Sequence, residues 1–176
     1  MPLEKGCVQV YTGNGKGKTT ASLGLILRAV GQGLKVCLVQ FMKGGGPYGE
    51  HIAAERLLPE LKVFRFGRDG WVRKGAPAED DLQEAARACQ MAKEALCDSR
   101  YDMVVLDEIN GAVDFGLISL EQVLELIALK RDKVELVMTG RNAHEQVIQR
   151  ADLVTEMREI KHYYQAGVGA RVGIES

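Results

Sequence analysis

The sequence lacks the long apolar run that a membrane-spanning helix requires. Such a helix needs about 20 consecutive apolar residues, and no stretch of this chain approaches that length. The first residues, MPLEKG, also lack the apolar core of a signal peptide. We therefore expect a cytoplasmic protein with no membrane partner.

An excess of charge of either sign is also missing. The 23 basic and 24 acidic residues leave a formal net charge of -1, so no overall field attracts a nucleic-acid backbone, and we expect no nucleic-acid partner. The chain has 46% hydrophobic and 27% charged residues, a balance typical of soluble globular proteins. Its 176 residues suit one domain, residues 1–176.

Cysteine and histidine are scarce and show no metal-binding spacing. No CxxC pair occurs among the cysteines, which are Cys7, Cys37, Cys89 and Cys97. We interpret them as reduced thiols of the core, since cytosolic thiols stay reduced. The histidines share no ligand spacing, which argues against a zinc site; they are His51, His144 and His162.

Short apolar runs alternate with helical patterns along the chain. Strands are predicted at 7–11, 35–41, 62–66, 103–106, 135–139 and 153–156, and helices at 19–30, 51–58, 79–97, 119–129 and 143–150. Residues 42–49 and 67–78 are predicted as loops, and 159–176 has no clear periodicity. The alternation favours an α/β fold in three layers, with a mainly parallel sheet flanked by helices on both faces.

A segment rich in glycine and lysine joins the first predicted strand to the first predicted helix. It reads TGNGKGKT over residues 12–19 and matches the end of the phosphate-loop pattern, with Gly17, Lys18 and Thr19 opening the helix. Backbone N–H groups and the helix N-terminus of such a loop bind phosphate, Lys18 can reach phosphate oxygens, and the Thr19 hydroxyl can ligate Mg²⁺. Thr12 stands where the pattern has its first glycine, so we expect a wider or differently shaped loop. A turn without a ligand would not explain two lysines at the start of a helix.

Two carboxylates follow the apolar run 103–106. Asp107 and Glu108 fall where parallel strands end, the usual ligand position in open α/β sheets. We expect one of them to face the Mg²⁺; the alternative is that they cap the following turn. Arg141 also follows a strand end, and it either reaches phosphate or pairs with a carboxylate on the surface.

Five segments resemble the ATP:corrinoid adenosyltransferases. They are TGNGKGKTTAS (12–22), VQFMKGG (39–45), VVLDEINGAVDFG (104–116), LVMTGRNA (136–143) and ADLVTEMREIKHYYQAGVGARVGIES (151–176), and they span nearly the whole chain. The resemblance implies a P-loop NTPase-like fold and an enzyme that transfers the 5′-deoxyadenosyl group of ATP to the Co(I) of a reduced corrinoid, releasing triphosphate.

The resemblance also implies residue roles. Lys18, Thr19 and Glu108 would be catalytic, because they stabilise the charge of the leaving triphosphate. Thr19 with Asp107 or Glu108 would hold the Mg²⁺ of MgATP, or Mn²⁺ in its place. The residues that bind ATP or the corrinoid are then Gly13, Asn14, Gly15, Lys16, Gly17, Lys18, Thr19, Thr20, Arg28 near the nucleoside, Arg141 and Trp71. No general base is expected, because Co(I) carries no proton.

Trp71 lies in the loop 67–78, where the family places bulky apolar side chains beneath the corrin ring to exclude the lower axial ligand. Val72 and Arg73 stand where a second aromatic residue is expected. Trp71 as a plug of the protein core is the alternative. The family resemblance further implies a homodimer and a flavoprotein reductant. Because the chain begins almost at its first strand, we expect the N-terminal cover found in many relatives to be absent or built differently.

Two other functions share the same motifs. A P-loop kinase or NTPase would use the loop, the metal and the carboxylates, but would release ADP and phosphate instead of triphosphate. A non-catalytic carrier of ATP or corrinoid would bind its ligand without turnover.

Overall fold

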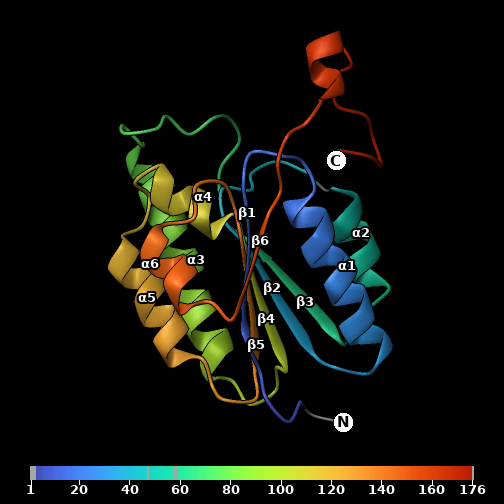
Figure 1. Ribbon diagram of the computed structural model, residues 1–176, viewed down its shortest axis with the longest axis vertical. Helices are drawn as coiled ribbons and strands as arrows, with labels where there is room; N and C mark the ends of the chain where they lie inside the picture. Colours follow the sequence, from blue (N-terminus) through green and yellow to red (C-terminus); the bar gives the residue numbers. More distant parts are fainter. Residues whose placement is uncertain (1–2, 47, 58, 176) are drawn as a thin grey trace.

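The computed structural model describes residues 3–46, 48–57 and 59–175, in which a central sheet lies between helices (Figure 1). The strands are β1 (Val8–Thr12), β2 (Val36–Gln40), β3 (Leu61–Arg65), β4 (Met103–Asp107), β5 (Glu135–Thr139) and β6 (Leu153–Glu156). The helices are α1 (Lys18–Gly31), α2 (Gly49–Glu55), α3 (Glu79–Cys97), α4 (Ile109–Asp114), α5 (Leu120–Leu129), α6 (Glu145–Arg150) and a short 3₁₀ helix, η1 (Tyr163–Ala166).

All strands of the six-stranded sheet run parallel, in the order β3-β2-β4-β5-β1-β6. The predicted three-layer α/β fold of P-loop NTPase type is confirmed. Gln40 pairs in register with Asp107, and Tyr11 pairs with Thr139. The carboxyl ends of β1, β2, β4 and β5 therefore meet at one edge, where ligands of open parallel sheets bind.

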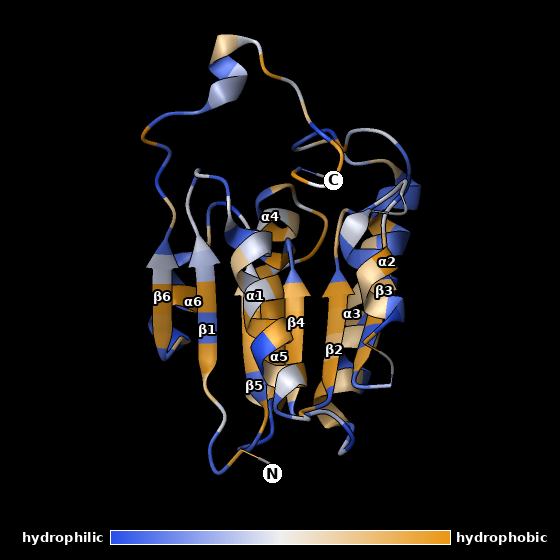
Figure 2. Cartoon of the chain, turned by 90° about the vertical axis from the view of Figure 1, so that its right-hand side faces the viewer, coloured by the Kyte–Doolittle hydropathy of each residue, from blue (hydrophilic) through white to orange (hydrophobic). Residues whose placement is uncertain are grey.

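Helices cover the two faces of the sheet unequally. Helices α1 and α2 lie on one face, and α3 to α6 lie on the other (Figure 1). Strand β4 shows how the core divides between them, because Val104 and Leu106 join the cluster on the α3 face while Met103 and Val105 join the cluster on the α1 face. Strands β2, β4 and β5 are buried along their whole length, and the apolar colouring of Figure 2 follows them.

The predicted boundaries agree with the structure to within a few residues, with two additions. Helix α4 begins directly after Glu108, whose φ of 63° turns the chain sharply at the strand end, and the apolar pattern gave no sign of this helix. The tail contains η1. Helix α2 begins and ends earlier than predicted, and Leu58, its predicted last residue, lies outside the described residues.

The cysteine prediction is partly wrong. Cys37 and Cys89 are buried as predicted, whereas Cys7 is half-buried and Cys97, at the end of α3, is exposed. In the described ranges, no helix combines the length and the apolar character that crossing a membrane would take.

Candidate functional site

The glycine-rich loop, residues 12–19, joins the end of β1 to the start of α1. Gly17 precedes α1 with φ 116°, and the first turn of α1 carries no acidic residue. The Lys18 side chain is buried, and its ammonium group donates a hydrogen bond to the Gly15 carbonyl at 2.8 Å. Burial lowers the pKa of Lys18, while the neighbouring Glu108 opposes this shift. A buried cation beside the N–H groups of a helix N-terminus forms a site suited to an anion.

The shape of this loop depends on the segment that follows β6. The Gly15 N–H donates to the Met157 carbonyl at 2.7 Å. A Cβ atom at Gly13 would lie 2.4 Å from the Met157 carbonyl oxygen, and one at Gly15 would lie 2.8 Å from it. Glycine is therefore required at both positions by the approach of the Met157 backbone. The pattern of the loop alone did not reveal this contact.

Thr12 explains the departure from the phosphate-loop pattern. It is buried at the end of β1, and its hydroxyl accepts a hydrogen bond from the Ala143 N–H at 3.1 Å. Its carbonyl accepts from the Met157 N–H at 2.8 Å. A glycine at this position would lose the hydroxyl contact that joins β1 to the segment after β5.

Asp107, the last residue of β4, lies behind the loop and is fully buried. One of its carboxylate oxygens, Oδ1, accepts from the Thr19 hydroxyl at 2.9 Å and from the Thr139 hydroxyl at 2.6 Å. The other, Oδ2, accepts from the Gln40 amide at 3.1 Å. Sequence reasoning missed Gln40, although it is the one amide in the otherwise apolar run of β2, VCLVQ.

Glu108 differs from Asp107 because it lines a cavity. Burial raises the pKa of Glu108, the adjacent Asp107 raises it further, and Lys18, Lys43 and Arg141 oppose the shift. A divalent cation at this position would relieve the repulsion between the two carboxylates. Among the described residues, no three His, Cys, Asp or Glu side chains converge, so phosphate oxygens and water would complete the shell of a cation held by Thr19 and Glu108.

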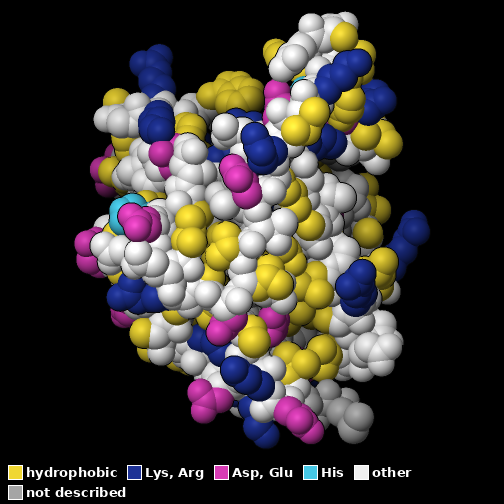
Figure 3. Space-filling view, in the orientation of Figure 1, with side chains coloured by type: hydrophobic (Ala, Val, Ile, Leu, Met, Phe, Trp, Pro, Cys, Tyr) yellow, Lys and Arg dark blue, Asp and Glu magenta, His cyan; other side chains and the backbone are white. Residues whose placement is uncertain are grey.

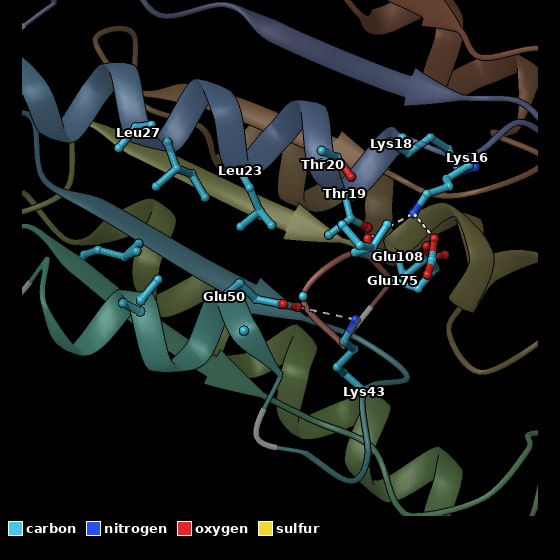
Figure 4. Close-up of a pocket in the computed structure, with 18 of the residues that line it drawn as sticks. Lys16, Lys18, Thr19, Thr20, Leu23, Leu27, Lys43, Glu50, Glu108 and Glu175 are labelled. Carbon is cyan, nitrogen blue, oxygen red and sulfur yellow. Dashed lines mark hydrogen bonds and ion pairs between the residues drawn. The ribbon is translucent and has the colours of Figure 1, made fainter. Parts of the chain in front are cut away.

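The cavity has a volume of about 560 Å³ and lies between α1 and α2. Lys16, Lys18, Thr19 and Glu108 form its polar end, and the side chains along the two helices form an apolar groove (Figure 4). The apolar members include Leu23, Ile26, Leu27, Ala53, Ala54 and Leu57. A small polar end on a largely apolar cleft is typical of a small-molecule site.

The C-terminal tail closes one side of this cavity. Gly173, Ile174 and Glu175 line it, and Lys16 lies 3.5 Å from the Glu175 carboxylate and 3.2 Å from the Ile174 carbonyl oxygen. On the opposite wall, Lys43 lies 3.5 Å from Glu50 of α2 (Figure 4). Lys16 is thus held by groups that a phosphate could replace.

A second hollow of about 470 Å³ adjoins the first, and Glu108 lines both. Met42, Tyr48, Trp71, Val72 and Phe115 are among its apolar and aromatic lining residues. The Trp71 side chain is 96% exposed. The alternative that Trp71 plugs the core is therefore wrong.

The structure brings most of the predicted site residues to the same edge of the sheet. Lys16, Gly17, Lys18, Thr19, Thr20 and Glu108 line the first cavity. Asn14 and the exposed Arg141 instead line a neighbouring hollow with Glu156, Arg158 and Glu159. Arg28 lies in the last turn of α1, is exposed, and is not among the residues that line the cavity.

Comparison with known proteins extends over nearly the whole chain. Residues 4–176 match the family described as ATP:corrinoid adenosyltransferase BtuR/CobO/CobP. The chain is 40% identical over 172 residues to the corrinoid adenosyltransferase of Escherichia coli (strain K12), covering 98% of this chain and 86% of that protein. The corrinoid adenosyltransferase of Pseudomonas aeruginosa is 38% identical, with coverage of 98% and 84%. Corrinoid adenosyltransferase CobA of Salmonella typhimurium is also 38% identical, with coverage of 98% and 86%.

Proposed function

This chain belongs to the ATP:corrinoid adenosyltransferase family, and we propose that it transfers the 5′-deoxyadenosyl group of ATP to the Co(I) of a reduced corrinoid. The electron pair of Co(I) forms the bond to the ribose C5′, and the electron pair of the broken C5′–O bond leaves with the triphosphate. The observation that carries the proposal is the position of Glu108, which lines both the cavity at the glycine-rich loop and the hollow beside Trp71. Two substrates can meet there.

The glycine-rich loop stabilises the leaving group in this reaction. Negative charge grows on the triphosphate as the C5′–O bond breaks, and fixed donors near that charge lower the barrier. Lys18 and the N–H groups at the start of α1 are such donors, because they are in place before the reaction. Positioning and electrostatics account for the catalysis, and no proton has to be removed from Co(I).

Thr19 and Glu108 are the residues that would hold Mg²⁺. The Thr19 hydroxyl donates a hydrogen bond to Asp107, so the lone pairs of the hydroxyl oxygen remain available to a cation. Asp107 has both carboxylate oxygens engaged by hydroxyl and amide donors, which fits an orienting role behind Thr19. Bound Mg²⁺ would supply positive charge to the triphosphate.

The hollow beside Trp71 is the proposed site of the corrinoid. Its aromatic and apolar lining suits the face of a large planar ring. Trp71 is available to pack against that ring, because it is exposed and does not pack in the protein core. Exclusion of the lower axial ligand is the role proposed for Trp71, and it rests on the family resemblance.

A homodimer and a flavoprotein reductant complete the proposal and rest mainly on the family resemblance, and a cytoplasmic location is proposed from the sequence. A second copy is further supported by exposed apolar side chains on β6 and the tail, among them Leu153, Ile160 and Val172. In Figure 3, hydrophobic side chains gather along the middle of the view, where β6 lies in Figure 1.

The test is an anaerobic assay with MgATP and chemically reduced cobalamin. Light-sensitive alkylcobalamin is followed by absorption, and released polyphosphate is measured in the same sample. Adenosyl transfer gives alkylcobalamin and triphosphate in equal amounts. ADP and phosphate formed without corrinoid would instead indicate an NTPase, and tight binding without turnover would indicate a carrier.

A further inference from the structure

A chain of hydrogen bonds joins α2 to the start of α1 through the interior of the protein. The His51 Nε2 atom lies 2.6 Å from Gln40 Oε1. The Gln40 amide nitrogen donates to Asp107 Oδ2 at 3.1 Å, and Asp107 Oδ1 accepts from the Thr19 hydroxyl at 2.9 Å. Gln40 and Asp107 are fully buried. His51 is therefore connected to Thr19 by groups that do not contact solvent.

The direction of each hydrogen bond is fixed by chemistry. The ionised Asp107 carboxylate only accepts, so the NH₂ end of the Gln40 amide faces it and the amide oxygen faces His51. His51 must then donate from Nε2. Its other ring nitrogen, Nδ1, accepts from the Tyr48 N–H at 3.1 Å. The imidazole is thus neutral and protonated at Nε2. Burial lowers the pKa of His51, which also favours the neutral imidazole.

Helix α2 also lines the cavity at the glycine-rich loop. Gly49, Glu50 and Ala53 line the cavity at the glycine-rich loop. His51 fastens the same helix to the end of β2, where Gln40 pairs with Asp107 in the sheet. One helix therefore contacts the cavity and, through His51, the carboxylate behind Thr19.

We propose that His51 is a positioning residue for the metal site: it fixes the Gln40 amide, which orients the Asp107 carboxylate and thereby the Thr19 hydroxyl. The proposal rests on the proposed function, because that function supplies the Mg²⁺. Without His51, the Gln40 amide can turn over and present its oxygen to Asp107, where two acceptors repel. A simpler role for His51 would be to cap the first turn of α2, and this role would not depend on a metal.

The experiment measures ATP affinity by calorimetry with excess Mg²⁺ and with EDTA, in the absence of corrinoid. The ratio of the two dissociation constants reports how strongly the metal contributes. His51→Ala should reduce this ratio by about tenfold, the lower end of the loss seen when an outer partner of a metal ligand is removed, and should leave the affinity in EDTA unchanged. His51→Gln keeps an amide donor for Gln40 and should restore most of the ratio. Glu55→Ala, an exposed change on the same helix, is the control and should match the wild type.

Three results would overturn the proposal. An equal loss of affinity with and without Mg²⁺, or a loss of thermal stability alone, would show that His51 only holds α2. A wild-type protein whose ATP affinity does not respond to Mg²⁺ would remove the metal site and the proposal with it. The adenosyl-transfer assay on the wild type is read separately, so failure of the proposed function is distinguishable from failure of the His51 proposal.

Discussion

The Thr19 hydroxyl donates a hydrogen bond of 2.9 Å to the Asp107 carboxylate, across 88 positions of sequence. This bond fixes the first turn of α1 to the end of β4. Because Thr139 donates to the same oxygen at 2.6 Å and Gln40 donates to the other oxygen at 3.1 Å, four elements, α1, β2, β4 and β5, are joined at one buried carboxylate. The neighbouring carboxylate, Glu108, lines the cavity instead. The two adjacent acidic residues therefore differ in what their replacement should do.

Glu108→Gln should abolish most activity without lowering stability. Its carboxylate is partly buried beside the Asp107 charge, so removal of the charge relieves repulsion. Loss of a preorganised electrostatic partner of the reaction costs about a hundredfold in rate. Asp107→Asn is the matched change. It keeps the oxygen that accepts from the two threonine hydroxyls but puts an NH₂ group against the Gln40 amide, so it should cost about 2 kcal/mol of unfolding free energy because a buried amide donor loses its acceptor. Urea unfolding measures the stability of the two variants, and the transfer assay measures their activity. Equal destabilisation by the two variants would contradict the different roles predicted for Glu108 and Asp107.

Lys18→Ala should weaken ATP binding while the protein stays folded. A hydrogen bond to a charged group contributes about 2 kcal/mol, or roughly thirtyfold in affinity. Lys93→Ala, which removes a half-buried lysine paired with Glu125 on the far face, is the control and should bind ATP as the wild type does. Calorimetric titration with ATP gives the comparison. Unchanged affinity in Lys18→Ala would place the triphosphate elsewhere.

Two glycine replacements should change stability in opposite directions. Gly15→Ala places a methyl group 2.8 Å from the Met157 carbonyl oxygen, and overpacking of this kind costs about 1–3 kcal/mol. Gly24 lies exposed within α1 with nothing within 4 Å of an added Cβ atom. Gly24→Ala should therefore add about 0.7 kcal/mol through helix propensity. Thermal unfolding measures both. A neutral Gly15→Ala would show that Met157 does not restrict the loop.

Much of the fold could be predicted from the sequence because its determinants are local. The short β-rich run CVQVY becomes strand β1, buried at alternate positions, and the apolar run MVVL becomes the fully buried strand β4. Ser119 caps α5 as its pattern predicts, accepting from the Gln122 N–H at 3.3 Å. Helix α4 could not be predicted in the same way. It depends on the left-handed turn at Glu108 and on packing against the end of β5, neither of which has a periodic signal.

Site residues could be predicted from the sequence where a local motif indicates their chemistry. They could not be predicted where segments distant in the sequence come together. Residues 12–19 predicted the loop, and Asp107 and Glu108 were predicted as a pair. Their different surroundings depend on Gln40 and Thr139, which reach Asp107 from neighbouring strands. The contacts of Met157 and Glu175 with the loop depend on how the tail returns over it, and this long-range path leaves no local pattern.

The stability of the protein should fall at high pH partly through Cys37. Burial raises the pKa of the Cys37 thiol to about 12 from an ordinary value of 9.0. Between these values the folded state holds a proton that the unfolded state has lost, so unfolding becomes easier as pH rises through this window. Cys37→Ala should give a shallower fall in the unfolding free energy between pH 8 and about 10.5. Cys97→Ala, at an exposed position, is the control and should keep the wild-type slope; equal slopes in all three proteins would contradict the prediction.

Trp71→Ala should separate the binding of the corrinoid from folding and from ATP binding. Because the side chain is 96% exposed, its removal should change the unfolding free energy by less than about 0.5 kcal/mol. ATP affinity should also stay the same, since Trp71 does not line the cavity at the glycine-rich loop. Transfer to cobalamin should fall roughly thirtyfold, the effect of losing about 2 kcal/mol from a Trp at a binding surface.

A corrinoid without a lower nucleotide ligand tests what Trp71 does once the ring is bound. If Trp71 excludes the lower ligand, Trp71→Ala should lose little activity with such a corrinoid, because there is no ligand to displace. If Trp71 only binds the ring, the activity of Trp71→Ala should fall by the same factor with both corrinoids. Trp71→Phe keeps an aromatic face and should retain most of the activity with cobalamin. Full activity of Trp71→Ala with cobalamin would refute both roles, and would direct attention to Val72 and Phe115, which line the same hollow.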